Sequence, residues 1–271
     1  MFRAELLKLS TIRSTQIAAF IGIVGIALTQ GLMFWFVPAL TLGLIDVPAD
    51  IGLPAFDTGS HAFQIAALNL VSGGSGSGSL SLALIAIVSI GVLAATTDYR
   101  FGGMATAALA QPRRVNILAG KVAATALIVA IIGVVYALVS VGVLWLATQT
   151  AQEALVISGG DILSAAARSI AALALLSLAA LAVGLLVRST LAAFLVVIGV
   201  VTIEPIIQGI GMMTGSAAGW MQWLPLALAQ TAAGDFAAAP GPNPLTALGM
   251  LAAGTLVLLV IAGAVLRRRD L

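Results

Sequence analysis

Six long apolar stretches decide which kind of fold this sequence can adopt. A helix needs about 20 residues to cross a hydrocarbon core of about 30 Å, and each stretch is near that length or longer. They lie near residues 15–37, 80–97, 118–147, 163–187, 190–213 and 245–266. The third stretch is longer than a crossing requires, so we expect it to tilt or to extend beyond the membrane. The sequence therefore predicts an all-α integral membrane protein with six transmembrane helices.

The composition supports a membrane environment for the whole chain. Charged residues make up 8% of the 271 residues and hydrophobic residues 61%, whereas a soluble domain carries about 25% charged residues. No stretch long enough for a separate soluble domain has a soluble composition. We therefore expect a single transmembrane domain over residues 1–271.

Residues that could support catalysis are scarce. The sequence has no cysteine and one histidine, His61, so disulfides, thiolate metal sites and histidine metal sites are not expected. It has no GxxxxGK[ST] phosphate loop, and a Ser/His/Asp hydrolase cannot be assembled convincingly. We expect no catalytic residue, no metal and no resident cofactor, and the chain is not predicted to be an enzyme.

The basic residues predict an orientation. If the amino terminus is inside, the inner segments hold all of the 12 lysines and arginines except Arg168. The outer segments hold most of the acidic residues, namely Asp46, Asp50, Asp57, Glu153, Asp161 and Asp235. This asymmetry follows the positive-inside rule and predicts that both termini are cytoplasmic.

Two kinds of shorter helix are expected beside the spans. Residues 1–14 combine apolar positions at helical spacing with basic residues, which is typical of an amphipathic helix on the membrane surface. The outer segment 214–244 carries Trp220 and Trp223 at helical spacing, as short interfacial or re-entrant helices do before a final span. Pro225 prevents a continuous helix there.

The inner segment 98–117 is the most informative loop. Its middle, Met104–Ala110, suits a short helix that follows Gly102-Gly103 and ends before Gln111-Pro112. Together with the arginines behind it, such a helix would form a rigid docking element. The simpler alternative is a solvated loop whose arginines only fix the topology.

These residues also carry a resemblance to a known family. The opening Glu5, Lys8 and Arg13, the inner segment and the basic ending LRRRDL resemble membrane subunits of ABC transporters of the second permease class, the ABC type-2 exporter family. In the inner segment the matching residues are Asp98, Arg100, Gly103, Leu109, Pro112, Arg114, Gly120 and Lys121. The resemblance covers the whole chain in layout, although each motif is short. Asp98 stands where glutamate is commoner, and Met104 where threonine often follows the glycine.

The resemblance implies a function and partners. Such a permease dimerises, as a homo- or heterodimer, and docks two separate ATPase subunits, which bind ATP and Mg²⁺. It exports an amphipathic or apolar cargo, such as a drug, a peptide antibiotic or a lipid, across the bacterial cytoplasmic membrane, and no nucleic acid is involved. The residues implied in ATPase coupling are Glu5, Lys8, Arg13, Asp98, Tyr99, Arg100, Gly103, Met104, Leu109, Pro112, Arg113, Arg114 and Lys121. A self-contained secondary transporter and a non-transporting accessory subunit are the alternatives.

Besides Lys121 near the inner end of the third span, two charged residues, Arg168 and Glu204, lie within predicted spans. Glu204 lies well inside the fifth, where a carboxylate costs roughly 2.5–3.5 kcal/mol on insertion scales, so a functional role is the default hypothesis. We favour an architectural role for Glu204 just before the outer short helices. Helical side chains lean toward their own amino terminus, so those of Arg168 and Glu204 should diverge. We expect Arg168 to snorkel to the outer surface.

Overall fold

The computed structural model describes residues 1–44, 57–72, 81–100, 103, 114–214, 219–234 and 242–268. Across these ranges the regular elements are helices, and no strand is present. Six helices are long and apolar enough to cross a membrane: Arg13–Thr41, Leu82–Tyr99, Val115–Ala151, Gly159–Val187, Thr190–Gly211 and Pro244–Arg268. The predicted all-α fold with six membrane-spanning helices is therefore confirmed.

The helices follow one another in a simple order. The chain begins with α1 (Phe2–Thr11) and α2 (Arg13–Gln30), and α2 continues through a π-helical segment (Gly31–Phe36) into α3 (Val37–Thr41). The remaining elements are α4 (His61–Ala67), α5 (Leu82–Arg100), α7 (Arg114–Ala151), α8 (Gly159–Val187), α9 (Thr190–Met213), a 3₁₀ turn (Met221–Trp223), α10 (Pro225–Ala233) and α11 (Pro244–Arg268).

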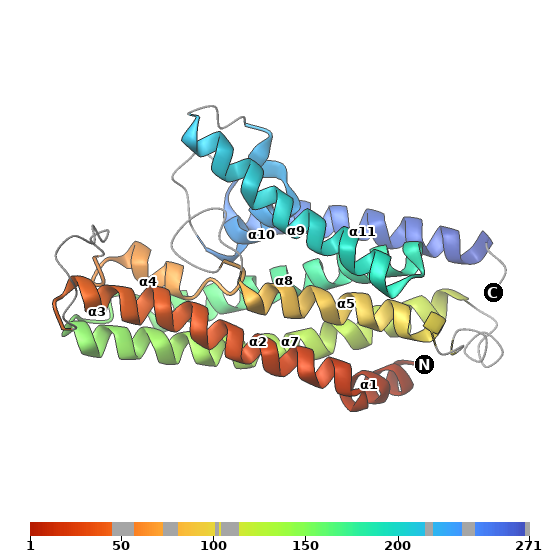
Figure 1. Ribbon diagram of the computed structural model, residues 1–271, viewed down its shortest axis with the longest axis horizontal. Coiled ribbons are helices and arrows are strands. Elements are labelled where there is room, and N and C mark those ends of the chain that lie inside the picture. The colour runs from red at the N-terminus through yellow and green to blue at the C-terminus, as the bar shows by residue number, and fades with distance from the viewer. Residues whose placement is uncertain are drawn as a thin grey trace.

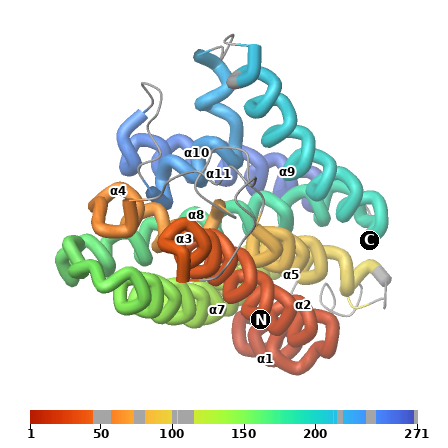
Figure 2. Tube along the Cα trace, turned by 60° about the vertical axis from the view of Figure 1, so that its left-hand side comes forward, coloured from red at the N-terminus to blue at the C-terminus, as the bar shows by residue number. Residues whose placement is uncertain are grey.

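The long helices form a bundle with three tiers (Figures 1 and 2). Helices α2 and α7 lie on one side, α5 and α8 lie in the middle, and α9, α10 and α11 lie on the other side. Helix α1 and the last turn of α11 lie at the same end of the bundle, which we call the terminal end. Helices α3 and α4 lie at the opposite end, the loop end.

The middle tier packs closely because small residues face each other. A Cβ added at Gly91 of α5 would lie 2.0 Å from the carbonyl oxygen of Ser177 in α8. One added at Gly184 of α8 would lie 2.7 Å from the Cβ of Ala95. The Ser177 hydroxyl also donates to the carbonyl of Ile87 at 3.1 Å. Small residues of this kind allow close backbone approach in membrane bundles, so α5 and α8 form a tightly joined pair.

Helix α7 is much longer than one crossing requires. Its 38 residues give a length of about 57 Å, against a hydrocarbon core of about 30 Å. At one end α7 packs against α1, and nearer the loop end it packs against α3 and α4. It therefore connects the two ends of the bundle.

Several helix boundaries differ from the apolar stretches for local reasons. The amino-terminal helix, predicted over residues 1–14, ends at Thr11 because Ile12 is extended, with φ −70° and ψ 123°, and Arg13 already belongs to α2. Helix α8 begins at Gly159, before the apolar stretch, because Ser158 and Asp161 form a capping box. The predicted short helices before the last span are the 3₁₀ turn and α10, and α10 begins at Pro225, the position where proline is favoured.

Candidate functional site: a buried charge cluster

Four charged side chains from three helices meet at the terminal end of the bundle. We call them the charge cluster: Glu5 and Lys8 of α1, Asp98 of α5 and Lys121 of α7. The Lys121 Nζ donates to Glu5 Oε1 at 3.0 Å, to Asp98 Oδ2 and to the carbonyl oxygen of Ala94 at 3.3 Å. The Lys8 Nζ donates to Asp98 Oδ1 and lies 3.5 Å from Glu5 Oε2. Two positive and two negative groups alternate, so the formal charges balance.

Local structure positions α1 for these contacts. Glu5 and Lys8 are three residues apart, which places them on the same face of a helix. The extended backbone at Ile12 ends α1 and allows it to change direction relative to α2. Gly120 leaves room for its approach to α7, because an added Cβ there would lie 3.1 Å from the Cβ of Met1. Helix α1 therefore lies against the start of α7, with its acidic and basic face toward the bundle.

The cluster is buried, which makes its pairing energetically important. Lys121 is 1% exposed, and Glu5 and Asp98 are also buried, whereas Lys8 reaches the surface. A buried charge costs several kcal/mol unless a partner compensates it, and removal of one partner leaves the other uncompensated. All three ammonium protons of Lys121 have an acceptor. The cluster therefore acts as a joint that fixes α1 to the end of α5 and the start of α7.

This arrangement changes how three of the sequence-predicted coupling residues can act. Glu5, Asp98 and Lys121 point inward and contact one another, so in this arrangement their side chains do not form an outer surface for another protein. Any role they have in coupling must act through the position of α1 relative to α5 and α7. The resemblance identified these residues as members of separate short motifs, but it did not indicate that their side chains would contact one another.

The other predicted coupling residues have different positions. Arg13 is exposed at the start of α2, and the Tyr99 ring lies 5.4 Å from the guanidinium carbon of Arg188. A Cβ at Gly103 would lie 3.1 Å from Asp98 Oδ1, so this glycine lies beside the charge cluster. Outside the described residues lie Met104, Leu109, Pro112 and Arg113, and the side chains of Arg100 and Arg114 are also outside the description.

Arg188 is a residue of this region that sequence reasoning missed. It follows α8 in a left-handed conformation, with φ 61°, which is uncommon for a residue with a side chain. Its guanidinium group packs over the Tyr99 ring in a cation–π contact. The available signal was its position as the single charged residue in the tight connection between the fourth and fifth spans.

Glu204 has a separate structural role. Its Oε2 accepts a hydrogen bond from the backbone amide of Leu226 at 3.0 Å, and its Oε1 accepts from the amide of Ala227 at 2.7 Å. Gln208 donates a third bond to Oε1 at 3.2 Å. The first amides of α10 lack a side-chain cap from Leu224, so Glu204 of α9 supplies the acceptors that a helix start requires.

Arg168 is not among the partners that the structure records for Glu204. It lies partly exposed on α8, and within the described ranges its Nε has no hydrogen-bond partner. The hydrogen bonds recorded at the Glu204 oxygens come instead from Gln208, Leu226 and Ala227.

The charge cluster joins α1, α5 and α7 through paired charges. In the part of the chain that the structure describes, no three His, Cys, Asp or Glu side chains gather to hold a metal ion. None of the four residues of the charge cluster lines the pocket between α7 and α11 or the pocket beside Glu204. No protein-family model and no curated protein matches the sequence.

Proposed function

We propose that this chain is the membrane-spanning subunit of an ATP-driven ABC exporter. In this proposal it dimerises, docks a separate ATPase that binds ATP and Mg²⁺, and moves an amphipathic or apolar cargo outward. It lies in a bacterial cytoplasmic membrane with both termini on the ATPase side. One observation carries the proposal: the charge cluster fixes α1 to α5 and α7, the two helices that flank residues 101–113.

The cluster supports coupling because it joins the predicted ATPase contacts to the spans. A force applied to α1 reaches α5 through Lys8 and Asp98, and it reaches α7 through Glu5 and Lys121. A force applied to residues 101–113 enters the same two helices directly. A movement of α5 then also moves α8, because the backbones of the two helices lie in close contact at Gly91 and Gly184. In this proposal, a movement of α1 or of residues 101–113 is therefore transmitted to α5 and α8 in the middle of the bundle.

The main alternative is a secondary transporter driven by an ion gradient. Such a transporter needs a polar site near the membrane midplane that binds and releases the coupling ion. Glu204 is the acidic residue at that depth, and its oxygens accept three hydrogen bonds that stabilise the start of α10. An exchange of protons or cations at Glu204 would disturb this cap, so the geometry favours the ATP-driven mechanism.

The proposal is tested by co-purification with a candidate ATPase. The tagged wild-type chain should retain the ATPase in mild detergent, and a variant with Arg100→Glu, Arg113→Glu and Arg114→Glu should lose it. A charge-reversal control is Arg267→Glu with Arg268→Glu, which alters two basic residues at the same end of the bundle but on α11. Retention by wild type and control, with loss from a monodisperse triple variant, supports the docking role of residues 100–114. Failure of wild type to retain any ATPase under several mild conditions, together with transport that depends on an ion gradient, would overturn it.

A further inference from the structure

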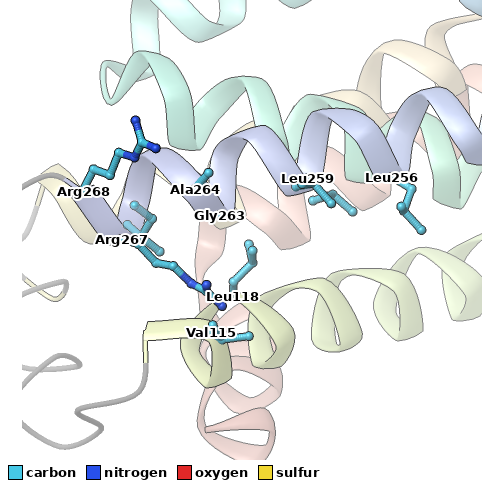
Figure 3. Close-up of a pocket in the computed structure, with 10 residues that line it drawn as sticks. Val115, Leu118, Leu256, Leu259, Gly263, Ala264, Arg267 and Arg268 are labelled. Atoms are coloured by element: carbon cyan, nitrogen blue, oxygen red, sulfur yellow. The ribbon is translucent and has the colours of Figure 1, made fainter.

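A groove opens between the start of α7 and the end of α11 at the terminal end (Figure 3). It has a volume of about 490 Å³, within the range of about 300–1,000 Å³ that is usual for small-molecule sites. It lies on α7 and α11 and is separate from the charge cluster on α1, α5 and α7. Both helices are among those long and apolar enough to cross a membrane, so a lipid in the bilayer can reach the groove.

The walls of the groove are apolar. Leu118 of α7 faces Gly263 of α11, and a Cβ at that glycine would lie 3.0 Å from the Leu118 Cδ2. Val115 on one wall is 46% exposed and Val260 on the other is 62% exposed. Gly263 and Ala264 are small, so α11 leaves space for the groove where it approaches α7. Such a channel accepts a flexible hydrocarbon chain, because each methylene gains by leaving polar surroundings.

The mouth of the groove is basic. Arg267 and Arg268 form the last turn of α11, and both are exposed. Figure 3 shows that Arg267 extends across the groove toward Val115 and Leu118, whereas Arg268 points away from it. The described lining residues include no acidic side chain. Guanidinium groups bind phosphate through paired hydrogen bonds, so the mouth suits an anionic headgroup.

We propose that this groove binds an anionic phospholipid. One acyl chain lies along the wall formed by Val260 and Ala264, and the headgroup phosphate is bound by Arg267, with Arg268 adding positive charge. Lipid is favoured over other occupants because the groove combines an apolar floor within a span with two arginines at its end, the two parts of a phospholipid. Basic pockets between membrane helices recognise anionic headgroups on this basis. The proposal does not depend on the transport function.

Native mass spectrometry of the purified chain tests the charge requirement. The chain is titrated with phosphatidylglycerol or phosphatidylcholine, and the bound fractions are compared. Wild type should prefer phosphatidylglycerol. Arg267→Gln with Arg268→Gln should weaken that preference about 25-fold, since each basic residue near an anionic surface contributes roughly fivefold. The control Arg3→Gln with Arg13→Gln removes the same charge from exposed positions on α1 and α2, and it should retain the preference.

Additional experiments distinguish a lipid in the groove from other occupants. Ala264→Trp and Val260→Trp each fill the groove, and at least one monodisperse variant should lose bound phosphatidylglycerol. Glycerol phosphate, which has the headgroup chemistry without the chains, should not displace the lipid. The proposal is overturned by equal binding of the two lipids to wild type, by equal losses in the arginine and control variants, or by displacement with glycerol phosphate. It is also overturned if monodisperse filling variants bind like wild type. The chain has no native cysteine, so an Ala264→Cys variant that crosslinks two copies in bilayers would assign the groove to a second copy instead.

Discussion

Replacement of Lys121 by methionine should weaken the attachment of α1 to the bundle. Methionine keeps an unbranched, flexible side chain but removes the ammonium group that donates to Glu5, Asp98 and the Ala94 carbonyl. The cluster is then left with two carboxylates and one lysine. Helix α1 loses its charged contact with α7, and of the charged contacts to the other helices only that from Lys8 to Asp98 of α5 remains.

The magnitude follows from burial and from the partners that are left. Removal of one member of a buried ion pair costs about 3–5 kcal/mol. Lys8 stays close to both carboxylates and is itself partly exposed, so it compensates part of the loss. We therefore expect about 3 kcal/mol, at the lower end of that range, which corresponds to a change of roughly 100-fold in the equilibrium between attached and detached α1.

The absence of native cysteine provides a direct assay of this equilibrium. Leu9 is almost completely buried beside the cluster, so the thiol of a Leu9→Cys variant reacts with a maleimide only when α1 opens. When opening and closing are fast, the labelling rate follows the open population. In this background Lys121→Met should accelerate labelling about 100-fold, whereas Arg3→Gln on the exposed face of α1 should leave the rate unchanged.

A double-mutant cycle tests whether the pairing itself is responsible. Glu5→Met combined with Lys121→Met leaves Lys8 and Asp98 as a balanced pair, so the double variant should label more slowly than the sum of the single effects predicts. A coupling of about 1–3 kcal/mol is expected for groups in direct contact. Labelling of the Lys121→Met variant within threefold of the parent rate, or strictly additive single effects, would refute the view that the cluster holds α1 in place.

Three further predictions concern the rest of the bundle, each measured by thermal unfolding in detergent. Glu204→Ala removes the acceptors for two amides of α10 and should cost about 1–3 kcal/mol, and Glu204→Gln, which keeps one oxygen, should cost less. Gly91→Ala places a Cβ 2.0 Å from the Ser177 carbonyl and should destabilise by more than about 2 kcal/mol, whereas Gly142→Ala, with no neighbour within 4 Å, should be neutral or stabilising by up to about 1 kcal/mol. Arg168→Ala and Glu204→Gln should be additive within about 0.5 kcal/mol, and a larger coupling would show that the two groups interact.

The spans could be predicted because they depend on local sequence. Each apolar stretch is long enough by itself, and no distant residue is needed to recognise it. The exact boundaries needed local signals of another kind, such as the capping box of Ser158 and Asp161 that starts α8 early. The short helix α10 was also predictable, since Trp220, Trp223 and Pro225 mark a break and a restart in the sequence.

The charge cluster could not be predicted, because it depends on contacts between distant segments. Lys121 is separated from Glu5 by 116 residues, and Lys8 from Asp98 by 90. Lys8 and Lys121, taken alone, lie in basic segments at the ends of spans, where the positive-inside rule already explains their presence. The scarcity of charge was a usable signal: acidic residues within mostly basic segments need a partner.

The partners of Glu204 could also not be predicted from the sequence. The sequence indicated that a carboxylate at this depth must have a reason, but not that its oxygens would be used by the amides of a helix about 20 residues later. One clue was available. Helix α10 starts with a proline and is preceded by Leu224, which has no side-chain acceptor, so its free amides required one from elsewhere in the fold.

A joint made of balanced charges differs from an apolar contact in a way that suits force transfer. Apolar surfaces allow small slides at little cost, because their attraction is not directional. In the charge cluster each Lys121 proton has one defined acceptor, so a shift of α1 along α7 separates several opposite charges at once. The formal charges balance, and this neutrality lets the joint lie within the bundle. We therefore expect that apolar replacement of both Glu5 and Lys121 preserves folding while any ATPase stimulation by cargo falls. Unchanged stimulation in a folded double variant would show that α1 transmits no force through this joint.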